Sequence, residues 1–333
     1  MSIALRSRMR AALASVLLVA SAGLVACDSE TQETNAAANQ VELARYLPQD
    51  TELVQTVDIA EARKELDLPE DANALPTSNK TFPRPKNPEA TLFKVTSRAY
   101  PDVMDTFVSQ FNGRGASPLD GTLIRAAAGG AQGVSIVSTA EPVEDVDRKL
   151  ELAGYSLKGK IYEARKDTPA SRFVADAGNG RFVFARELQD AQAVLRRVRN
   201  DAHAGEAAEA LEPASGTVRL ALTNEDKRSC VTAFSAAMEA TGEGAALALI
   251  ISGDKPEPER FDPRALKGLA TGTPTVLVDA LLVPIRVKKP LKDGLDALDQ
   301  LVSFSDSFEV TRSRRTQGKK KFVLPPFKSY DCP

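Results

Sequence analysis

The chain has 333 residues, of which 43% are hydrophobic, so it carries enough apolar side chains to build a folded core. Its 43 basic and 45 acidic residues give a net charge of −2, whereas nucleic-acid-binding proteins usually carry a clustered excess of basic residues. The composition therefore argues against a disordered chain and against a nucleic-acid partner.

The N-terminus has the order of a bacterial secretory signal. Arg6, Arg8 and Arg10 come first, without any acidic residue among them, and an apolar run over 11–22 follows. This run is shorter than the roughly 20 apolar residues that a membrane-spanning helix needs. A basic segment, an apolar segment and then small residues are typical of a signal peptide, which the sequence predicts over 1–26.

The segment Leu24-Val25-Ala26-Cys27 resembles the lipobox of bacterial lipoproteins. In that family the cysteine sulfur receives a diacylglyceryl group, and a peptidase then cuts the chain before the cysteine. The resemblance implies that Cys27 is the lipidation site and that the protein is held at the outward, extracytoplasmic face of a bacterial membrane. The alternative is an ordinary secretory signal with an incidental cysteine.

Two further cysteines, Cys230 and Cys332, remain after Cys27. Exported proteins form disulfides because their compartment is oxidising, so an even pair predicts a disulfide between them. Such a bond would hold the C-terminal tail against a helix that the spacing of Cys230, Phe234 and Met238 predicts. The alternative is two unpaired thiols.

The segment 27–40 is polar and alanine-rich and is predicted to be a flexible tether, and a first lobe is expected over 41–200. Asp58 followed by Glu61 is typical of an N-terminal helix cap. The elements expected in this lobe are a strand over 52–57, a helix after Asp58, a helix around Val103, Phe107 and Phe111, a strand over 134–137, a helix over 143–150, a strand over 155–165, a hairpin of 172–177 with 181–185, and a helix over 188–198.

A segment rich in alanine and glutamate over 201–215 marks an expected boundary, and a second lobe is expected over 215–333. Its predicted elements are strands over 217–222, 247–251 and 275–285, helices over 230–238 and 291–302, and a hairpin of 308–312 with 320–324. Long strands mixed with helices predict an α+β fold with antiparallel or mixed sheets and helices packed on one face. The similar order of elements leaves it open whether the two lobes are related.

The stretches 45–51 and 172–199 resemble parts of some uncharacterised cell-envelope lipoproteins of bacteria. The first is a short phrase ahead of a strand, and the second is a hairpin followed by a helix. No activity is agreed for that group, so the resemblance implies only a fold and a location.

The sequence offers few residues for catalysis. The one histidine, His203, lies in the polar segment 201–215, so neither a Ser-His-Asp triad nor a zinc site is expected, and no phosphate-binding or dinucleotide motif is present. Asp58, Asp176 and Asp279, which lie in or beside apolar strands, are the candidates for a carboxylate pair.

These observations predict a lipid-anchored envelope protein with a binding, scaffold or assembly role, no enzymatic activity, and no cofactor or metal. Its expected partners are the membrane, through the lipid on Cys27, and an envelope protein or a wall component. Two alternatives stay open. An apolar cavity between the lobes would favour a solute- or lipid-binding lipoprotein of a transport system, and two carboxylates about 5–10 Å apart in a cleft would favour a hydrolase.

Overall fold

The structure is a computed structural model that describes much of the chain between residues 40 and 287. The described ranges are 40–51, 53–75, 88–99, 118–130, 133–164, 172–200, 205–212, 216–223, 231–240, 246–251, 269–273, 275–276 and 280–287. The helices expected around Val103 and over 291–302, and the hairpin expected over 308–324, lie outside these ranges.

Strands and helices alternate irregularly along the described chain. The strands are β1 Leu53–Asp58, β2 Ile124–Gly130, β3 Val134–Thr139, β4 Tyr155–Lys158, β5 Ile161–Ala164, β6 Phe173–Gly178, β7 Arg181–Ala185, β8 Val218–Thr223, β9 Val231–Met238, β10 Ala246–Ile251, β11 Leu269–Thr271, β12 Thr275–Val276 and β13 Ala280–Val287. The helices are α3 Ile59–Glu65, α4 Pro88–Ala99, α6 Val143–Leu152, α7 Leu188–Arg199 and α8 Glu206–Ala210. Residues 40–45 are also helical.

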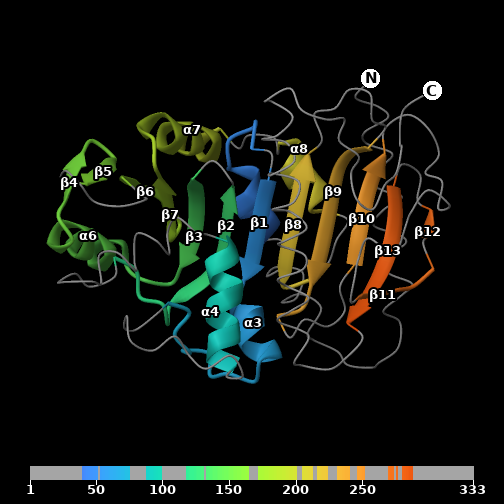
Figure 1. Cartoon of the computed structure of the whole chain (residues 1–333). Coiled ribbons are helices and arrows are strands. Elements are labelled where there is room, and N and C mark those ends of the chain that lie inside the picture. The colour runs from blue at the N-terminus through green and yellow to red at the C-terminus, as the bar shows by residue number, and fades with distance from the viewer. Residues whose placement is uncertain are drawn as a thin grey trace, which may run out of the picture.

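All of these strands belong to one sheet, which runs across the molecule in Figure 1. Their order is β11-β13-β10-β9-β8-β1-β2-β3-β7-β6-β5-β4, and β12 pairs with β13. Each pairing is antiparallel. The predicted α+β fold with an antiparallel sheet is therefore confirmed.

The two halves of the chain meet where β1 pairs with β8. Their register places Thr56 opposite Arg219 and Val57 opposite Val218, so strands from both expected lobes lie in one sheet and the segment 201–215 does not separate two sheets. Outward from this seam, β1-β2-β3-β7 on one side matches β8-β9-β10-β13 on the other. In each half, the first three strands pair in chain order, and a later strand, β7 or β13, pairs with the third of them.

Helices cover both faces of the sheet, whereas the sequence predicted one face. On the first face, one core cluster joins helical residues 40–45, α7 and α8 to strand residues such as Val54 and Ile136. The helix α4 contacts β1 and β2, but its buried Leu92 and Val95 do not belong to that cluster. It lies on the second face, in front of β2 in Figure 1. Both faces need a cover because central strands such as β3 are buried at every residue.

Most strong periodic patterns predicted their elements correctly. The structure confirms the strands expected over 52–57, 134–137, 217–222 and 247–251 as β1, β3, β8 and β10. It also confirms the capped helix after Asp58 as α3, the helices α6 and α7, and the hairpin of β6 with β7. Three expected elements differ from the structure in type or extent, and one strand was not expected.

The segment expected to be the helix 230–238 is instead β9. A spacing of four residues fits one face of a helix and equally one face of a strand, whose side chains alternate with a period of two. Pairing with β8 and β10 decides the outcome. The sequence analysis also gave no element for 124–130, which forms β2, because alanine and glycine have low strand propensity.

The other differences concern segment boundaries. The single strand expected over 155–165 is the hairpin of β4 and β5, which turns at Gly159 with φ +67°. The strand expected over 275–285 is divided into β12 and β13. Within the expected boundary 201–215 lies α8, whose alanines are buried. Gln40, expected at the end of the tether, is helical and 2% exposed.

Two hairpin turns each contain a glycine with a positive φ, but the steric surroundings of these two glycines differ. In the turn between β6 and β7, Asn179 and Gly180 have φ +55° and +68°, as a type I′ turn requires. A Cβ on Gly180 would lie 2.4 Å from the carbonyl oxygen of Thr139, whereas a Cβ on Gly159 would have nothing within 4 Å. The two glycines therefore share backbone strain but differ in steric contact.

Replacing either glycine by alanine tests this difference. We expect Gly159→Ala to lower the free energy of unfolding by about 1 kcal/mol, because only the left-handed backbone is strained. Gly180→Ala should cost about 1–3 kcal/mol more, because its methyl group also displaces the Thr139 carbonyl. Urea denaturation of the two variants measures both values. Equal losses would contradict the close approach of Gly180 to β3.

Candidate functional site

The residues that the sequence marked for anchoring and cross-linking lie outside the described ranges. These are Cys27, Cys230 and Cys332, and the same holds for His203 and Asp279. The lipidation site and the disulfide therefore stay predictions. Among the residues that the structure describes, no helix has the length and apolar character that crossing a membrane requires.

The two described carboxylates of the expected set, Asp58 and Asp176, lie on opposite faces of the sheet. Asp58 ends β1 and Asp176 lies in β6, four strands away, which is about 19 Å at ordinary strand spacing. The register connects Asp176 to Val57, the neighbour of Asp58, through one row of paired residues: Phe182, Val137 and Ala127. Because neighbouring residues of a strand point to opposite faces, these two carboxylates do not form a pair.

Asp58 instead belongs to a group of buried polar side chains at the junction of β1 and β8. We call Gln40, Thr56, Asp58 and Arg219 the seam cluster; each is at most 6% exposed. The Thr56 Oγ1 donates to Gln40 Oε1 at 3.1 Å. The carbonyl oxygen of Gly216 accepts from Gln40 Nε2 at 3.5 Å and from Arg219 Nε at 3.1 Å.

Burial shifts the pKa values of both charged members of the seam cluster toward their neutral forms. It raises the pKa of the Asp58 carboxyl, which is opposed by the backbone N–H of Glu61 at 2.9 Å and by Gln40. Burial likewise lowers the pKa of Arg219, against the attraction of Asp58. The cluster holds two opposite charges away from water, and this arrangement is stable only while their hydrogen bonds are kept.

Glu65 makes a second connection across the seam, from the end of α3. Its Oε1 accepts from the Thr217 hydroxyl, and its Oε2 accepts from the backbone N–H of Ala240 at 2.5 Å. Thr217 precedes β8 and Ala240 follows β9, so one carboxylate joins the first half of the sheet to two segments of the second half. Burial is the main cause that raises the pKa of this carboxyl.

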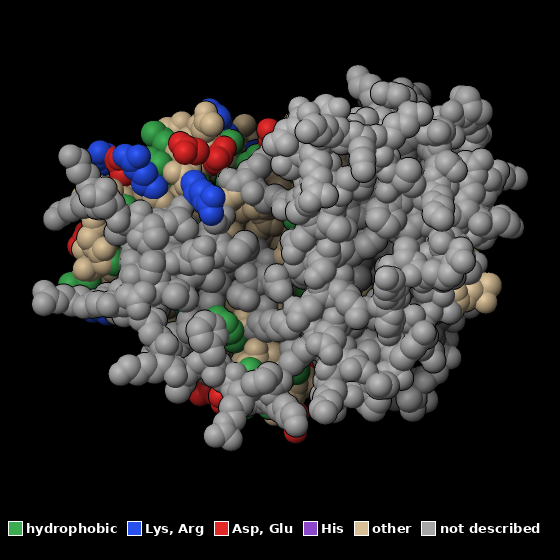
Figure 2. All heavy atoms as spheres, viewed as in Figure 1, with side chains coloured by type: hydrophobic (Ala, Val, Ile, Leu, Met, Phe, Trp, Pro, Cys, Tyr) green, Lys and Arg blue, Asp and Glu red, His purple; other side chains and the backbone are tan. Residues whose placement is uncertain are grey.

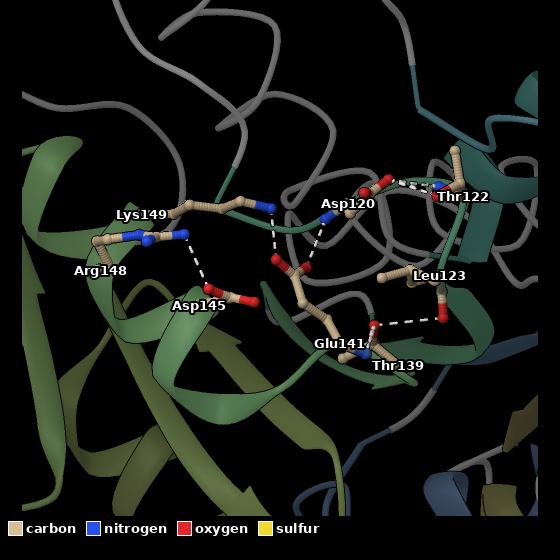
Figure 3. A network of polar contacts seen from close by, with 8 residues as sticks. All are labelled: Asp120, Thr122, Leu123, Thr139, Glu141, Asp145, Arg148 and Lys149. Carbon is tan, nitrogen blue, oxygen red and sulfur yellow. Dashed lines mark hydrogen bonds and ion pairs between the residues drawn. The ribbon is translucent and has the colours of Figure 1, made fainter.

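A third network joins the loop before β2 to the start of α6 (Figure 3). Glu141, only 5% exposed, accepts from Lys149 Nζ and from the backbone N–H of Asp120 at 2.7 Å. Asp120 in turn accepts from the hydroxyl of Thr122 at 2.7 Å. The Thr139 hydroxyl donates to a backbone carbonyl at 3.3 Å and accepts from the Glu141 N–H at 3.0 Å. The network fixes a loop and a helix start rather than presenting free groups.

Among the described residues, no group of three or more histidine, cysteine, aspartate and glutamate side chains is placed to hold a metal ion. On the surface, Figure 2 shows basic and acidic side chains side by side over α7. This helix carries Asp190 in its first turn and Arg196, Arg197 and Arg199 in its last turn. The visible described surface there has mixed charge.

The sequence analysis missed the buried or half-buried charges Arg63, Glu65, Glu141 and Arg219. One of them had a usable signal: Arg63 follows Ile59 by four residues on the buried stripe of α3, where the helical period expects an apolar residue. Arg219 gave no such signal, because it alternates with Val218 and Leu220 in β8 as a solvent-facing residue would. Arg63 donates to three backbone carbonyls at 2.8–2.9 Å, those of Ala72, Gly121 and Ile124.

No family model and no curated protein matches this chain. Solved structures that resemble it include crystal forms I, III and IV of TP0453, a Treponema lipoprotein. Form I has a TM-score of 0.41 and 12% identity and covers 78% of this chain and 96% of that chain. Form III has a TM-score of 0.39 and 10% identity and covers 76% of this chain and 96% of that chain. Form IV has a TM-score of 0.40 and 11% identity and covers 76% of this chain and 96% of that chain. Likenesses at this level carry no conclusion about function.

Lys149→Met should lower the free energy of unfolding by about 1.5–3 kcal/mol, because it leaves the Glu141 carboxylate buried without its cation. The neighbouring Arg148 is the matched control: its ion pair with Asp145 is exposed, with 69% and 44% of the two side chains accessible. Arg148→Met should therefore cost no more than about 0.5 kcal/mol. Thermal and urea unfolding of both variants measure the difference, and similar losses would contradict a structural role for the Glu141 pair.

Glu65→Gln removes the half-buried carboxylate but keeps an oxygen that accepts from the Ala240 N–H. A carboxyl with a raised pKa binds its proton more tightly in the folded state than in the unfolded chain. Its contribution to stability is full below the unfolded pKa of about 4.3 and is lost as pH rises through the folded pKa. The stability of wild type minus that of E65Q should therefore fall as pH rises above about 4.3.

Urea denaturation at several pH values measures this difference, in which the titration of Asp58 cancels because both proteins contain it. Glu65→Ala is the second comparison, and it should be less stable than E65Q at every pH because both hydrogen bonds are lost. A difference between wild type and E65Q that rises with pH would show that the carboxylate, not the acid, is the stabilised form.

Proposed function

We propose that this protein is a lipid-anchored, extracytoplasmic envelope protein that binds or scaffolds other envelope components and catalyses no reaction. The observation that carries the proposal is the leader, in which a basic start and an apolar run end in Leu24-Val25-Ala26-Cys27. Diacylation of Cys27 would attach the mature chain to the membrane surface, because each buried CH2 contributes about 0.8 kcal/mol.

The point at which the described fold begins supports an anchor on a short connection. Gln40 is already buried in the seam cluster, so residues 28–39 alone would link the lipid to the folded body. A flexible tether of this length has a root-mean-square reach of roughly 20 Å. The body would therefore stay close to the membrane surface, within reach of partners in the same layer of the envelope.

The non-catalytic part of the proposal is supported by the roles of the described charged groups. Asp58 and Asp176 lie on opposite faces of the sheet, and the carboxylates of the half-buried Glu65 and the buried Glu141 accept hydrogen bonds from protein donors. These groups hold segments of the fold together. Such a fold offers a rigid body for binding, with the partner expected to be an envelope protein or a wall component.

Cys27→Ala should release the protein from membranes, because the lipid would no longer form. Fractionation of cells followed by a high-salt wash measures the change, with wild type expected in the pellet and the variant in the soluble fraction. Cys230→Ala is the matched control and should stay in the pellet, since it removes a cysteine without touching the leader. A Cys27→Ala variant that remains in the washed pellet would show that another feature holds the protein there.

The binding role is tested by crosslinking in intact membranes and identifying the partner. A wall component or an envelope protein without transport activity would support the scaffold or assembly role. A permease that co-purifies with wild type but not with the Cys27→Ala variant would support the transport alternative instead of the scaffold or assembly role.

A further inference from the structure

Two buried polar atoms, one on β1 and one on α4, have no hydrogen-bond partner in the part of the chain that the structure describes. They are Oε1 of Gln55 and Oγ1 of Thr96. Thr96 is 0% exposed, and a buried polar atom without a partner is rare in a folded protein because it loses its bond to water. Their presence on two touching elements therefore calls for a shared partner.

Both side chains lie on the same face of the sheet. Thr56 faces the seam cluster, so its neighbour Gln55 points to the opposite face, where α4 packs. On α4, Thr96 follows Leu92 by four residues and Val95 by one, and all three are buried, so they share the stripe that faces the sheet. The elements that α4 contacts most are β1, β2 and α3.

Small residues lie beside Gln55 in its row of the sheet. The residue directly opposite it on β2 is Gly129, which has no side chain, and the next in the same row is the small Ser135. Larger residues bound this row on either side: Leu220 pairs with Gln55, and Phe184 pairs with Ser135. Next to Gln55 the row therefore carries little side-chain volume.

We propose that one ordered water molecule lies beside Gln55 and bridges it to Thr96. The paired residues in the row of Gln55 are neutral, so a charged ligand would lose its hydration without a counter-charge from this row. Water can donate and accept, so it satisfies the buried end of Gln55 in either orientation of the amide. A water in a polar site with two or more partners is a common part of a folded interior.

Magnetic relaxation dispersion of water nuclei on the purified full chain counts its long-lived internal waters. Thr96→Val removes the hydroxyl with almost no change of shape, so we expect the count to fall by one and Tm to fall by about 2–4 °C. Gln55→Met should have the same two effects. The double variant should lose no second water, and its Tm should fall by less than the sum of the two single shifts, because the same molecule is lost in each.

Thr56→Val is the matched control. Thr56 is also 0% exposed, but its hydroxyl is bonded to Gln40 on the other face, so this variant should lower Tm without changing the water count. An unchanged count in T96V overturns the proposal, whether Tm rises because an unpartnered hydroxyl has gone or falls because a protein group was its partner. If T96V does not fold, Q55M decides by the same count.

Discussion

β1 exchanges backbone hydrogen bonds with β2 on one side and with β8 on the other, so a strand of six residues joins the two halves of the sheet. The strands β1 and β8 are far apart in sequence, and bringing them together costs loop-closure entropy before any contact offsets it. The helices on both sides depend on this junction. Helical residues 40–45 and α8 pack over one face of it, and α4 packs over the other.

The seam cluster fixes the register of this junction more sharply than apolar residues would. A slip of one residue between β1 and β8 would move Arg219 from the face of Asp58 and Gly216 to the face of α4. There it would be a buried cation among apolar side chains, at a cost of several kcal/mol. Apolar neighbours such as Val218 and Leu220 would tolerate the same slip better. Buried charge therefore acts here as a constraint on pairing.

The start of the fold is tied to the body by several independent contacts. Gln40 belongs to the seam cluster, the Arg45 guanidinium lies 3.0 Å from the Glu212 carboxylate, and Arg181 donates to Glu42 at 2.6 Å. These partners lie in β1, in β7 and just after α8. In the proposed lipoprotein, residues 40–45 would therefore be held firmly to the body at the start of the described fold.

The sequence by itself determined the elements whose local signal agrees with their place in the fold. The Asp58 cap, the apolar stripe of α7 and the Asn179-Gly180 turn need only a few neighbouring residues to form. It also contains the segment Leu24-Val25-Ala26-Cys27, a linear motif on which the proposed anchor rests. Arg219 alternates with Val218 and Leu220 as a solvent-facing residue would, so the strand pattern gave no sign of its burial.

Only the tertiary structure decided the remaining elements. β9 is a strand because β8 and β10 lie on its two sides, although its spacing of four residues also fits a helix. β2 is a strand despite its alanines and glycines, because β1 and β3 pair with it on both sides. The seam cluster arises where distant segments meet, and no local pattern records a meeting of that kind. That is why the sequence named Asp58 as a candidate but not the partners that surround it.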